Sequence, residues 1–265
     1  TTEIYTLSLH DALPISQIFK EIEKKVIIIF ISIAILQTIS WYFASRRFFR
    51  LNLAQYFTDE IQVKVFELMY WFSGDFITYF IIPILIIVFV FKEKLYNYGL
   101  TVGDAKFGLA TSTIFLTIML PLSWFFSSSP DFIVQYPHLS VARNDWTIFI
   151  LYEFGIFIYL LAWEFVWRGF VLFGLYEKFG NYAIFIQMIP FVILHNGKPF
   201  PETIGAIAGG IILGYFALRT KSIYYCVITH SGVMLMIDFI STLRFRTEEY
   251  GIGISSIIRI LKELF

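Results

Sequence analysis

The sequence predicts an all-α membrane protein, a polytopic transmembrane helical bundle of about seven to eight spans. Hydrophobic residues make up 58% of the chain and the mean hydropathy is +0.72, whereas apolar residues make up roughly 45–50% of soluble domains. Charged residues make up only 15%, too few to cover the surface of a soluble protein of this size. Several runs approach the roughly 20 apolar residues that a helix needs to cross a bilayer.

Seven apolar segments follow one another along the chain and define the predicted helices. They cover residues 26–44, 68–91, 108–126, 147–175, 183–194, 203–218 and 223–240. The fifth segment is short for a membrane span and leads into the turn HNGKPFPE at 195–202. Because irregular backbone at membrane depth must be buried or must line a cavity, we expect this turn to face a polar pocket.

The remaining segments divide the chain into parts. Residues 1–16 lack the charged start, apolar stretch and cleavage site of a signal peptide. They resemble a translated sequencing-adapter fragment, so we exclude them and expect that the native start is missing or replaced. Residues 17–146 are predicted to form the N-terminal transmembrane helices and connectors, and 147–240 the later group of helices. Residues 241–265 form a C-terminal tail whose end is typical of an amphipathic surface helix.

Charge and cysteine content exclude several classes of function. The formal net charge is zero, so the sequence predicts no basic face for nucleic acid. Cys226 is the single cysteine, which excludes an internal disulfide framework and a cysteine metal cage. We expect Cys226 to be a small apolar residue within a helix.

Ionisable residues inside the predicted spans concentrate in the second half of the chain. An ionisable group costs roughly 2.5–3.5 kcal/mol to insert at mid-membrane and often marks a functional site. Glu164 and Arg168 are four residues apart and share a helix face, either as a structural ion pair or as part of a site. His195 and His230 belong to two other spans. Glu153, about 16 Å from Glu164 along the helix, is expected near the membrane interface.

Two histidines and a carboxylate indicate hydrolytic chemistry. Zinc in hydrolytic sites commonly takes such ligands and keeps one position for water. The metal lowers the pKa of that water to roughly 7. Without a metal, a carboxylate and a histidine can act as general bases towards water. The sequence therefore predicts a divalent metal, zinc, bound by Glu164, His195 and His230, and leaves the metal-free route open.

Three motifs in order carry a family resemblance. They are WEFVWRG at 163–169, FVILH at 191–195, and GGIILGYFALRTKSIYYCVITH at 209–230. Together they resemble the CAAX protease and bacteriocin-processing family, abbreviated CPBP and also called the Abi family. This family is similar to the eukaryotic prenyl protein endoprotease that acts on CAAX sequences. The family pattern is Glu-Glu-x-x-x-Arg, Phe-x-x-x-His and His-x-x-x-Asn or Asp on consecutive late spans. The resemblance implies that 147–240 is the catalytic core and that Glu164, Arg168, His195 and His230 are its catalytic residues.

The chain departs from the family pattern at two positions. Trp163 stands where the family has its first Glu, which is usually assigned the catalytic role, and Met234 stands where the family has Asn or Asp. Glu202 and Asp238 are therefore secondary candidates for a further carboxylate, with interfacial solvated carboxylates as the alternative interpretation. A Trp-Glu start with a Lys-Pro-x-x-Glu turn also resembles a bacterial branch of the family.

The leading hypothesis is an intramembrane endopeptidase of a bacterial cytoplasmic membrane. Glu164 would act as base or ligand, the histidines would bind the metal or orient water, and Arg168 would hold Glu164. Its expected partners are the lipid bilayer and a membrane-associated peptide or protein substrate. The second hypothesis is an inactive family member that binds a membrane peptide as an immunity or scaffold protein. A proton-relay transporter is a third, for which the sequence lacks internal repeats. Convergence of Glu164, His195 and His230 favours hydrolysis over a scaffold.

Overall fold

A computed structural model describes residues 23–264, and these residues form helices joined by short connections. Six helices are long and apolar enough to cross a membrane, and the shorter apolar helix at Tyr182–Ile193 accompanies them. The predicted polytopic helical bundle is therefore confirmed. The adapter-like segment 1–16 lies outside the described residues.

The helices follow the predicted order, with boundaries that differ by several residues. Asp59 caps the second long helix by accepting a hydrogen bond from the backbone N–H of Gln62 at 2.8 Å, so this helix begins well before residue 68. The elements are α2 (Lys24–Phe43), α3 (Arg46–Asn52), η1 (Ala54–Tyr56), α4 (Glu60–Phe76), η2 (Ile77–Ile81), α5 (Ile82–Leu85), η3 (Ile86–Phe91), η4 (Leu95–Tyr98), α6 (Ala105–Phe126), α7 (Pro130–Gln135), η5 (Ser140–Arg143), α8 (Trp146–Glu164), η6 (Phe165–Phe173), α9 (Gly174–Phe179), α10 (Tyr182–Ile193), α11 (Phe200–Thr220), α12 (Tyr224–Thr247) and α13 (Ile254–Leu264).

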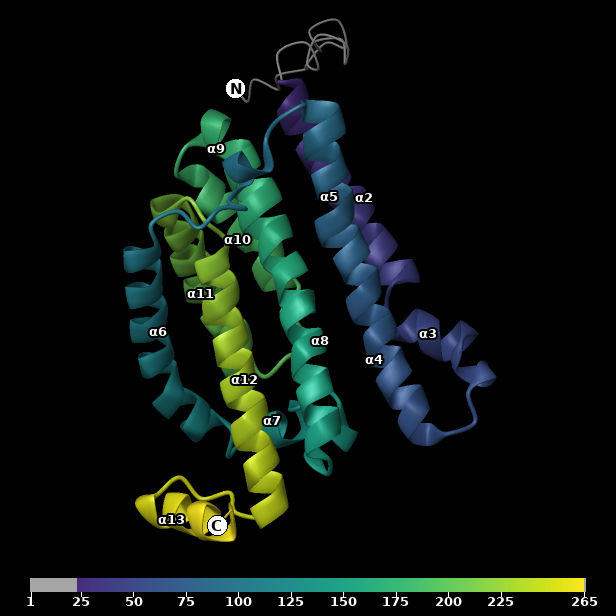
Figure 1. Ribbon diagram of the computed structural model, residues 1–265, viewed down its shortest axis with the longest axis vertical. Helices are drawn as coiled ribbons and strands as arrows, with labels where there is room; N and C mark the ends of the chain where they lie inside the picture. The colour runs from purple at the N-terminus through teal and green to yellow at the C-terminus, as the bar shows by residue number, and fades with distance from the viewer. Residues whose placement is uncertain (1–22, 265) are drawn as a thin grey trace, which may run out of the picture.

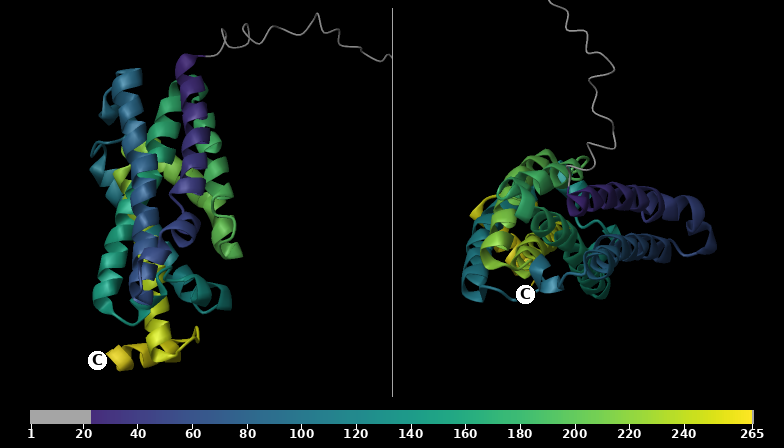
Figure 2. Two further views of the ribbon diagram at one scale, coloured as in Figure 1. Left: turned by 90° about the vertical axis from the view of Figure 1, so that its right-hand side faces the viewer. Right: turned by 90° about the horizontal axis from the view of Figure 1, so that it is seen from above.

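Two groups of helices lie side by side in the bundle (Figure 1). Helix α2 and the continuous rod from α4 to η3 form one group, which packs onto the other mainly through α4 and α8. In the second group α10 packs on α11, and α12 packs on both α6 and α8. The view from above shows the α2 and α4 rods extending to one side of this second group (Figure 2). The three predicted spans that carry Glu164, His195 and His230 all belong to the second group.

The surface of the bundle is apolar where lipid would meet it. Helix α8 exposes Ile150, Leu151 and Phe154, each about two-thirds accessible, while its opposite face is buried. Exposed large hydrophobic residues also run along α2, α6 and α11. A soluble monomer rarely exposes such a continuous apolar surface, so the packing agrees with a protein that spans a membrane several times.

A π-helical stretch follows α8 without a break. Element η6 begins directly after Glu164 and contains Arg168, and eight of its nine residues are buried. The N-terminus of α8 is capped by Asp145, whose carboxylate accepts the backbone N–H groups of Ile148 and Thr147. These bonds lower the pKa of the Asp145 carboxyl group. The sequence predicts this long helix, but its π-helical register is set by packing. Such π segments are frequent at functional sites.

The C-terminal helix α13 lies across the end of α12 (Figure 1). Arg244 on α12 is fully buried, and its hydrogen bonds join the end of α6 to the segment before α13. Its guanidinium donates to Ser127 Oγ and to the Trp124 carbonyl oxygen, both at 2.9 Å, and to the Gly251 carbonyl oxygen at 2.9 Å. These bonds fix the segment before α13 to the end of α6. The predicted helix in the tail is confirmed, while its position at a membrane surface stays a prediction.

We expect Gly103→Ala to destabilise the fold because of a close backbone approach. Gly103 has φ +55, and an added Cβ would lie 1.9 Å from the Thr220 carbonyl oxygen, which also accepts the N–H of Asp104. The substitution is expected to cost more than about 1 kcal/mol and to lower the midpoint of thermal unfolding in detergent. Gly205→Ala is the matched control, since a Cβ there meets nothing within 4 Å. Equal midpoints for both variants would contradict this account.

Candidate active site

Glu164 and Arg168 form a buried ion pair at the junction of α8 and η6. Both side chains have 0% relative accessibility, and Arg168 Nη1 lies 3.2 Å from each carboxylate oxygen of Glu164. The guanidinium carbon of Arg168 also lies 4.1 Å from the centre of the Phe191 ring. The two side chains share a helix face as their spacing predicts. The positive charge and the stacked ring hold the Glu164 carboxylate in one orientation.

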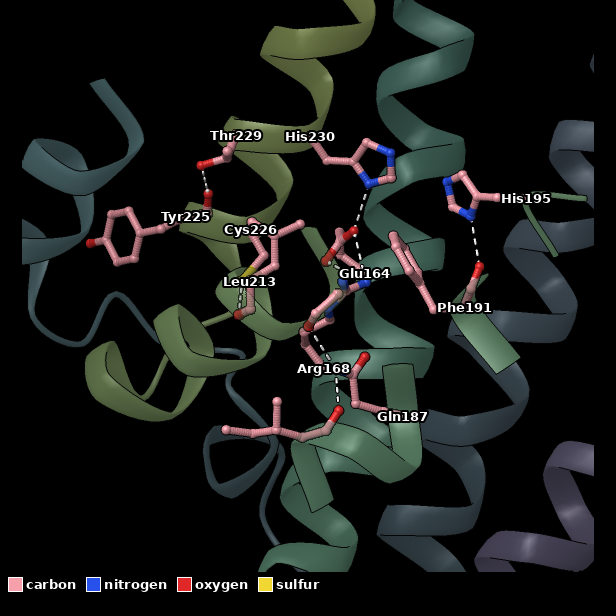
Figure 3. Close-up of polar contacts among 12 residues, drawn as sticks. Glu164, Arg168, Gln187, Phe191, His195, Leu213, Tyr225, Cys226, Thr229 and His230 are labelled. Atoms are coloured by element: carbon pink, nitrogen blue, oxygen red, sulfur yellow. Dashed lines mark hydrogen bonds and ion pairs between the residues drawn. The ribbon is translucent and has the colours of Figure 1, made fainter. Parts of the chain in front are cut away.

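His230 on α12 completes this arrangement from the opposite helix. Its Nδ1 lies 2.6 Å from Glu164 Oε1, and Figure 3 shows the imidazole directly above the carboxylate. An ionised carboxylate can only accept a hydrogen bond, so Nδ1 carries the proton. In a neutral imidazole the other nitrogen, Nε2, then has a free lone pair. Glu164 therefore fixes both the orientation and the tautomer of His230.

His195 has the same tautomer for a different reason. It follows α10, and its Nδ1 lies 2.6 Å from the backbone carbonyl oxygen of Phe191, which can only accept. The backbone of His195 is also held, because Thr203 Oγ1 donates to its carbonyl oxygen at 2.9 Å. In Figure 3 the ring nitrogens of His195 and His230 that make no drawn contact point towards one another. Two basic nitrogens thus face the same space.

That space is a cavity of about 440 Å³ between α6, α11 and α12. Most of its wall consists of apolar side chains. Its polar wall residues are Ser123, His195, Glu202, Thr229 and His230. Glu164 is not part of the wall. The structure therefore brings both predicted histidines to one cavity. Glu164 bonds to His230, Arg168 pairs with Glu164, and neither of these two residues lines the cavity.

The two departures from the family pattern also lie at this site. The ring of Trp163 packs with its centre 6.3 Å from that of His195 and 6.1 Å from that of Phe191. An indole therefore fills the position beside His195 where the family has its first Glu. Met234 is buried and lines the cavity one turn after His230. Both substitutions make this part of the site apolar.

The secondary carboxylate candidates have separate environments. Glu202 lines the cavity, and its Oε1 accepts a hydrogen bond from Lys198 Nζ at 2.6 Å. Asp238 has 0% relative accessibility and accepts the hydroxyl of Tyr152 at 3.0 Å. The interpretation of Asp238 as a solvated interfacial carboxylate is therefore wrong, because packing between α8 and α12 encloses it. Glu153, expected near the membrane interface, is half-buried beside Tyr152, with one carboxylate oxygen shielded.

The three predicted metal ligands do not converge on one point. Over residues 23–264 no three His, Cys, Asp or Glu side chains are grouped so that they could hold a metal ion. The site offers two free imidazole nitrogens to the cavity, while the predicted third ligand, Glu164, contacts Nδ1 of His230 instead. Histidine nitrogens are usual direct ligands of zinc. A carboxylate bonded to the other nitrogen of such a histidine is a usual outer-layer partner, and Glu164 has this relation to His230. Zinc binding therefore stays a proposal.

Sequence reasoning missed the partners of these carboxylates. The hydroxyl of Tyr136 donates to Glu202 Oε2, and Tyr152 donates to Asp238. The i,i+4 spacing of Lys198 and Glu202 is a signal that could have identified their ion pair. Nothing in the sequence pattern connects Tyr136 to Glu202, because the contact depends on how the connection between α6 and α8 folds.

The fold and the site together define a multi-pass helical membrane protein with two histidines at one cavity and a buried carboxylate, Glu164, bonded to one of them. Residues 144–236 match the family model described as Type II CAAX prenyl endopeptidase Rce1-like. This segment contains Glu164, Arg168, His195 and His230, so all four predicted catalytic residues lie within the match. The resemblance indicated by the three motifs is thus confirmed. No curated protein and no solved structure matches the chain.

Proposed function

We propose that this chain is an intramembrane endopeptidase that hydrolyses a peptide bond with a water held between His195 and His230. The observation that carries the proposal is the pair of free Nε2 nitrogens at one cavity, with Glu164 bonded to Nδ1 of His230 at 2.6 Å. A water between two such nitrogens would be oriented and made more basic. The family match over residues 144–236 supports this reaction class.

The polar contacts suggest a separate role in the reaction for each residue. His230 Nε2 accepts a proton from the water as the water oxygen bonds to the peptide carbonyl carbon. Glu164 stabilises the resulting imidazolium, as a carboxylate does in the serine protease triad. The imidazolium then gives this proton to the amide nitrogen, and the C–N bond breaks. Arg168 keeps Glu164 in place and ionised. In this scheme Glu164 is a positioning residue, because it has no contact with the cavity.

A divalent metal would be an alternative to this scheme, because an Nε2 lone pair that binds a metal cannot also accept a proton from water. His195 and His230 would hold it through Nε2, and Glu164 would support His230 from behind. A zinc ion at this position would lower the pKa of its bound water to roughly 7 and so supply hydroxide at neutral pH. Chelation of the purified protein tests this requirement directly.

The cavity indicates the chemistry of the proposed substrate. Its wall is mostly apolar and opens among helices that would contact lipid, so it suits an apolar stretch of a membrane-associated peptide or protein. A bacterial cytoplasmic membrane is the proposed location, in line with the Lys-Pro-x-x-Glu turn at 198–202. Lipids of that membrane would be the other partner of the chain.

A second candidate function is supported by the two departures from the family pattern. Trp163 and Met234 leave apolar groups where the family has polar ones, and Trp163 packs beside His195. Such a site could bind a membrane peptide without cleaving it, as an immunity or scaffold protein would. Binding without turnover distinguishes this candidate from the peptidase.

The test is cleavage of a fluorogenic peptide library by the purified protein in detergent. We expect wild-type protein to cleave a subset of apolar peptides, and Glu164→Ala and His195→Ala to reduce cleavage to background. Both variants should be checked for folding by size-exclusion chromatography and thermal unfolding. Loss of activity with a chelator, restored by zinc, would support the metal. A well-folded wild-type protein that binds library peptides but cleaves none would favour the scaffold.

A further inference from the structure

Glu202 is the one carboxylate among the described residues that line the cavity. It lies in the first turn of α11, and its side chain is only 16% accessible. Lys198 Nζ donates to its Oε1 at 2.6 Å, and the hydroxyl of the fully buried Tyr136 donates to its Oε2. Both oxygens are therefore held in place, and the ammonium group of Lys198 lies directly beside the carboxyl group.

The turn between α10 and α11 fixes Glu202 relative to His195. Thr203 Oγ1 donates to the carbonyl oxygen of His195 at 2.9 Å. The backbone N–H of Glu202 donates to the Pro199 carbonyl oxygen at 3.0 Å, which starts α11. Hence His195 and Glu202 belong to one rigid unit and border the same cavity. A motion that displaced one of them would displace the other.

Glu202 retains the capacity to bind water. An ionised carboxylate has about four acceptor sites, and Lys198 and Tyr136 use two of them. Trp163, whose ring packs against His195, offers only an N–H donor and no acceptor. A water at His195 can therefore find an anionic acceptor in the cavity wall at Glu202, while Glu164 is enclosed behind His230.

Peptide hydrolysis releases two protons from the attacking water, and His230 accounts for one of them. The first proton passes through His230 to the leaving amine. The second remains on the hydroxyl group of the tetrahedral intermediate. When the C–N bond breaks, this proton must leave for the product to become a carboxylate. In an apolar cavity it needs an acceptor close by.

We propose that Glu202 is a further catalytic residue, which orients the water and accepts this second proton as the intermediate collapses. The products are then a carboxylate, a neutral amine and a protonated Glu202, which returns its proton to solvent beside the partly exposed Lys198. The inference rests on the proposed function, since it assigns a role within the same hydrolysis. It also explains the contacts of Glu202 with Lys198 and Tyr136, which hold its carboxylate in place in the cavity wall.

The test compares Glu202→Gln with wild-type protein on a peptide that wild-type protein cleaves. Glutamine has nearly the same shape and can still accept from Tyr136. We expect kcat to fall on the order of 100-fold, the lower end of general acid–base effects, with KM changed less than about twofold. Glu202→Asp should recover part of the activity. Glu202→Ala should be inactive and should regain turnover when formate is added, because formate supplies a carboxylate to the vacated space.

Two control variants separate catalysis from a structural role. Lys198→Met and Tyr136→Phe each remove one contact of Glu202 but keep its carboxylate. If Glu202 only holds the turn together, these variants should lower the midpoint of thermal unfolding as much as Glu202→Gln does, and formate should restore no activity to Glu202→Ala. Unchanged kcat in Glu202→Gln, with His230→Gln inactive, would overturn the role of Glu202 and leave the proposed function standing. A folded wild-type protein that cleaves no peptide would overturn both.

Discussion

Replacement of His230 by glutamine is expected to lower kcat/KM for peptide cleavage on the order of 10³- to 10⁴-fold. His230 carries the free nitrogen that would take the proton from water, and Glu164 sets its tautomer through a 2.6 Å contact. In the serine protease triad, changing the carboxylate to its amide costs about 10⁴-fold because the wrong tautomer forms. We therefore expect Glu164→Gln to be almost as defective as His230→Gln.

The double variant distinguishes a cooperating pair from two independent groups. Residues that act as a unit show strongly non-additive losses. Glu164→Gln combined with His230→Gln should be no slower than His230→Gln alone. Cys226→Ala is the matched control, since Cys226 is buried one turn before His230 and its Sγ donates to the Leu213 carbonyl oxygen at 3.2 Å. Additive losses in the double variant would show that Glu164 does not act through His230.

Arg168→Met is expected to produce the largest loss of stability. The substitution leaves the Glu164 carboxylate fully buried without its ion-pair partner. Removal of one member of a buried pair typically costs about 3–5 kcal/mol, whereas replacing both members by neutral groups is often nearly neutral. Equilibrium unfolding in detergent, followed by circular dichroism, measures this loss.

A second substitution at Glu164 tests the origin of that loss. Combining Arg168→Met with Glu164→Gln removes the uncompensated charge and should restore most of the stability, although not the activity. Arg219→Met is a matched control, because Arg219 pairs with Asp104 on the surface at 3.1 Å with both side chains at least 40% exposed, and such pairs contribute little. If the double variant is less stable than Arg168→Met alone, the unpaired charge is not the cause.

The sequence was sufficient to predict the fold and the main polar residues of the site. Helical membrane spans are determined by local apolar length, and so the polytopic helical bundle was confirmed, with six helices of spanning length and one shorter apolar helix among residues 23–264. The i,i+4 relation of Glu164 and Arg168 is likewise local. The family motifs identified His195 and His230, and the structure brings both to one cavity. These features depend on neighbouring residues along one helix or on a motif.

The remaining features depend on contacts between distant segments. Glu164 was predicted as a base or ligand facing water, but the register of α8 and η6 places it behind His230. Asp238 is enclosed because Tyr152 approaches it from α8. Glu202 meets Tyr136 through a connection that has no periodic pattern. No local rule specifies which faces of two helices meet, so these contacts could not be derived from spacing alone.

If α13 lies at the membrane surface as predicted, its attachment through Arg244 makes the two leaflets of the membrane unequal for this protein. An amphipathic helix such as α13 rests at the level of the lipid headgroups, and Arg244 ties that level to the end of α12. His230 precedes Arg244 by fourteen residues, or about 21 Å of helix, in a hydrocarbon layer about 30 Å thick. His230 would then belong to the far leaflet, roughly 9 Å below its surface. Peptides anchored in that leaflet would reach the histidines by a short path, whereas peptides anchored on the α13 side would have to cross most of the bilayer.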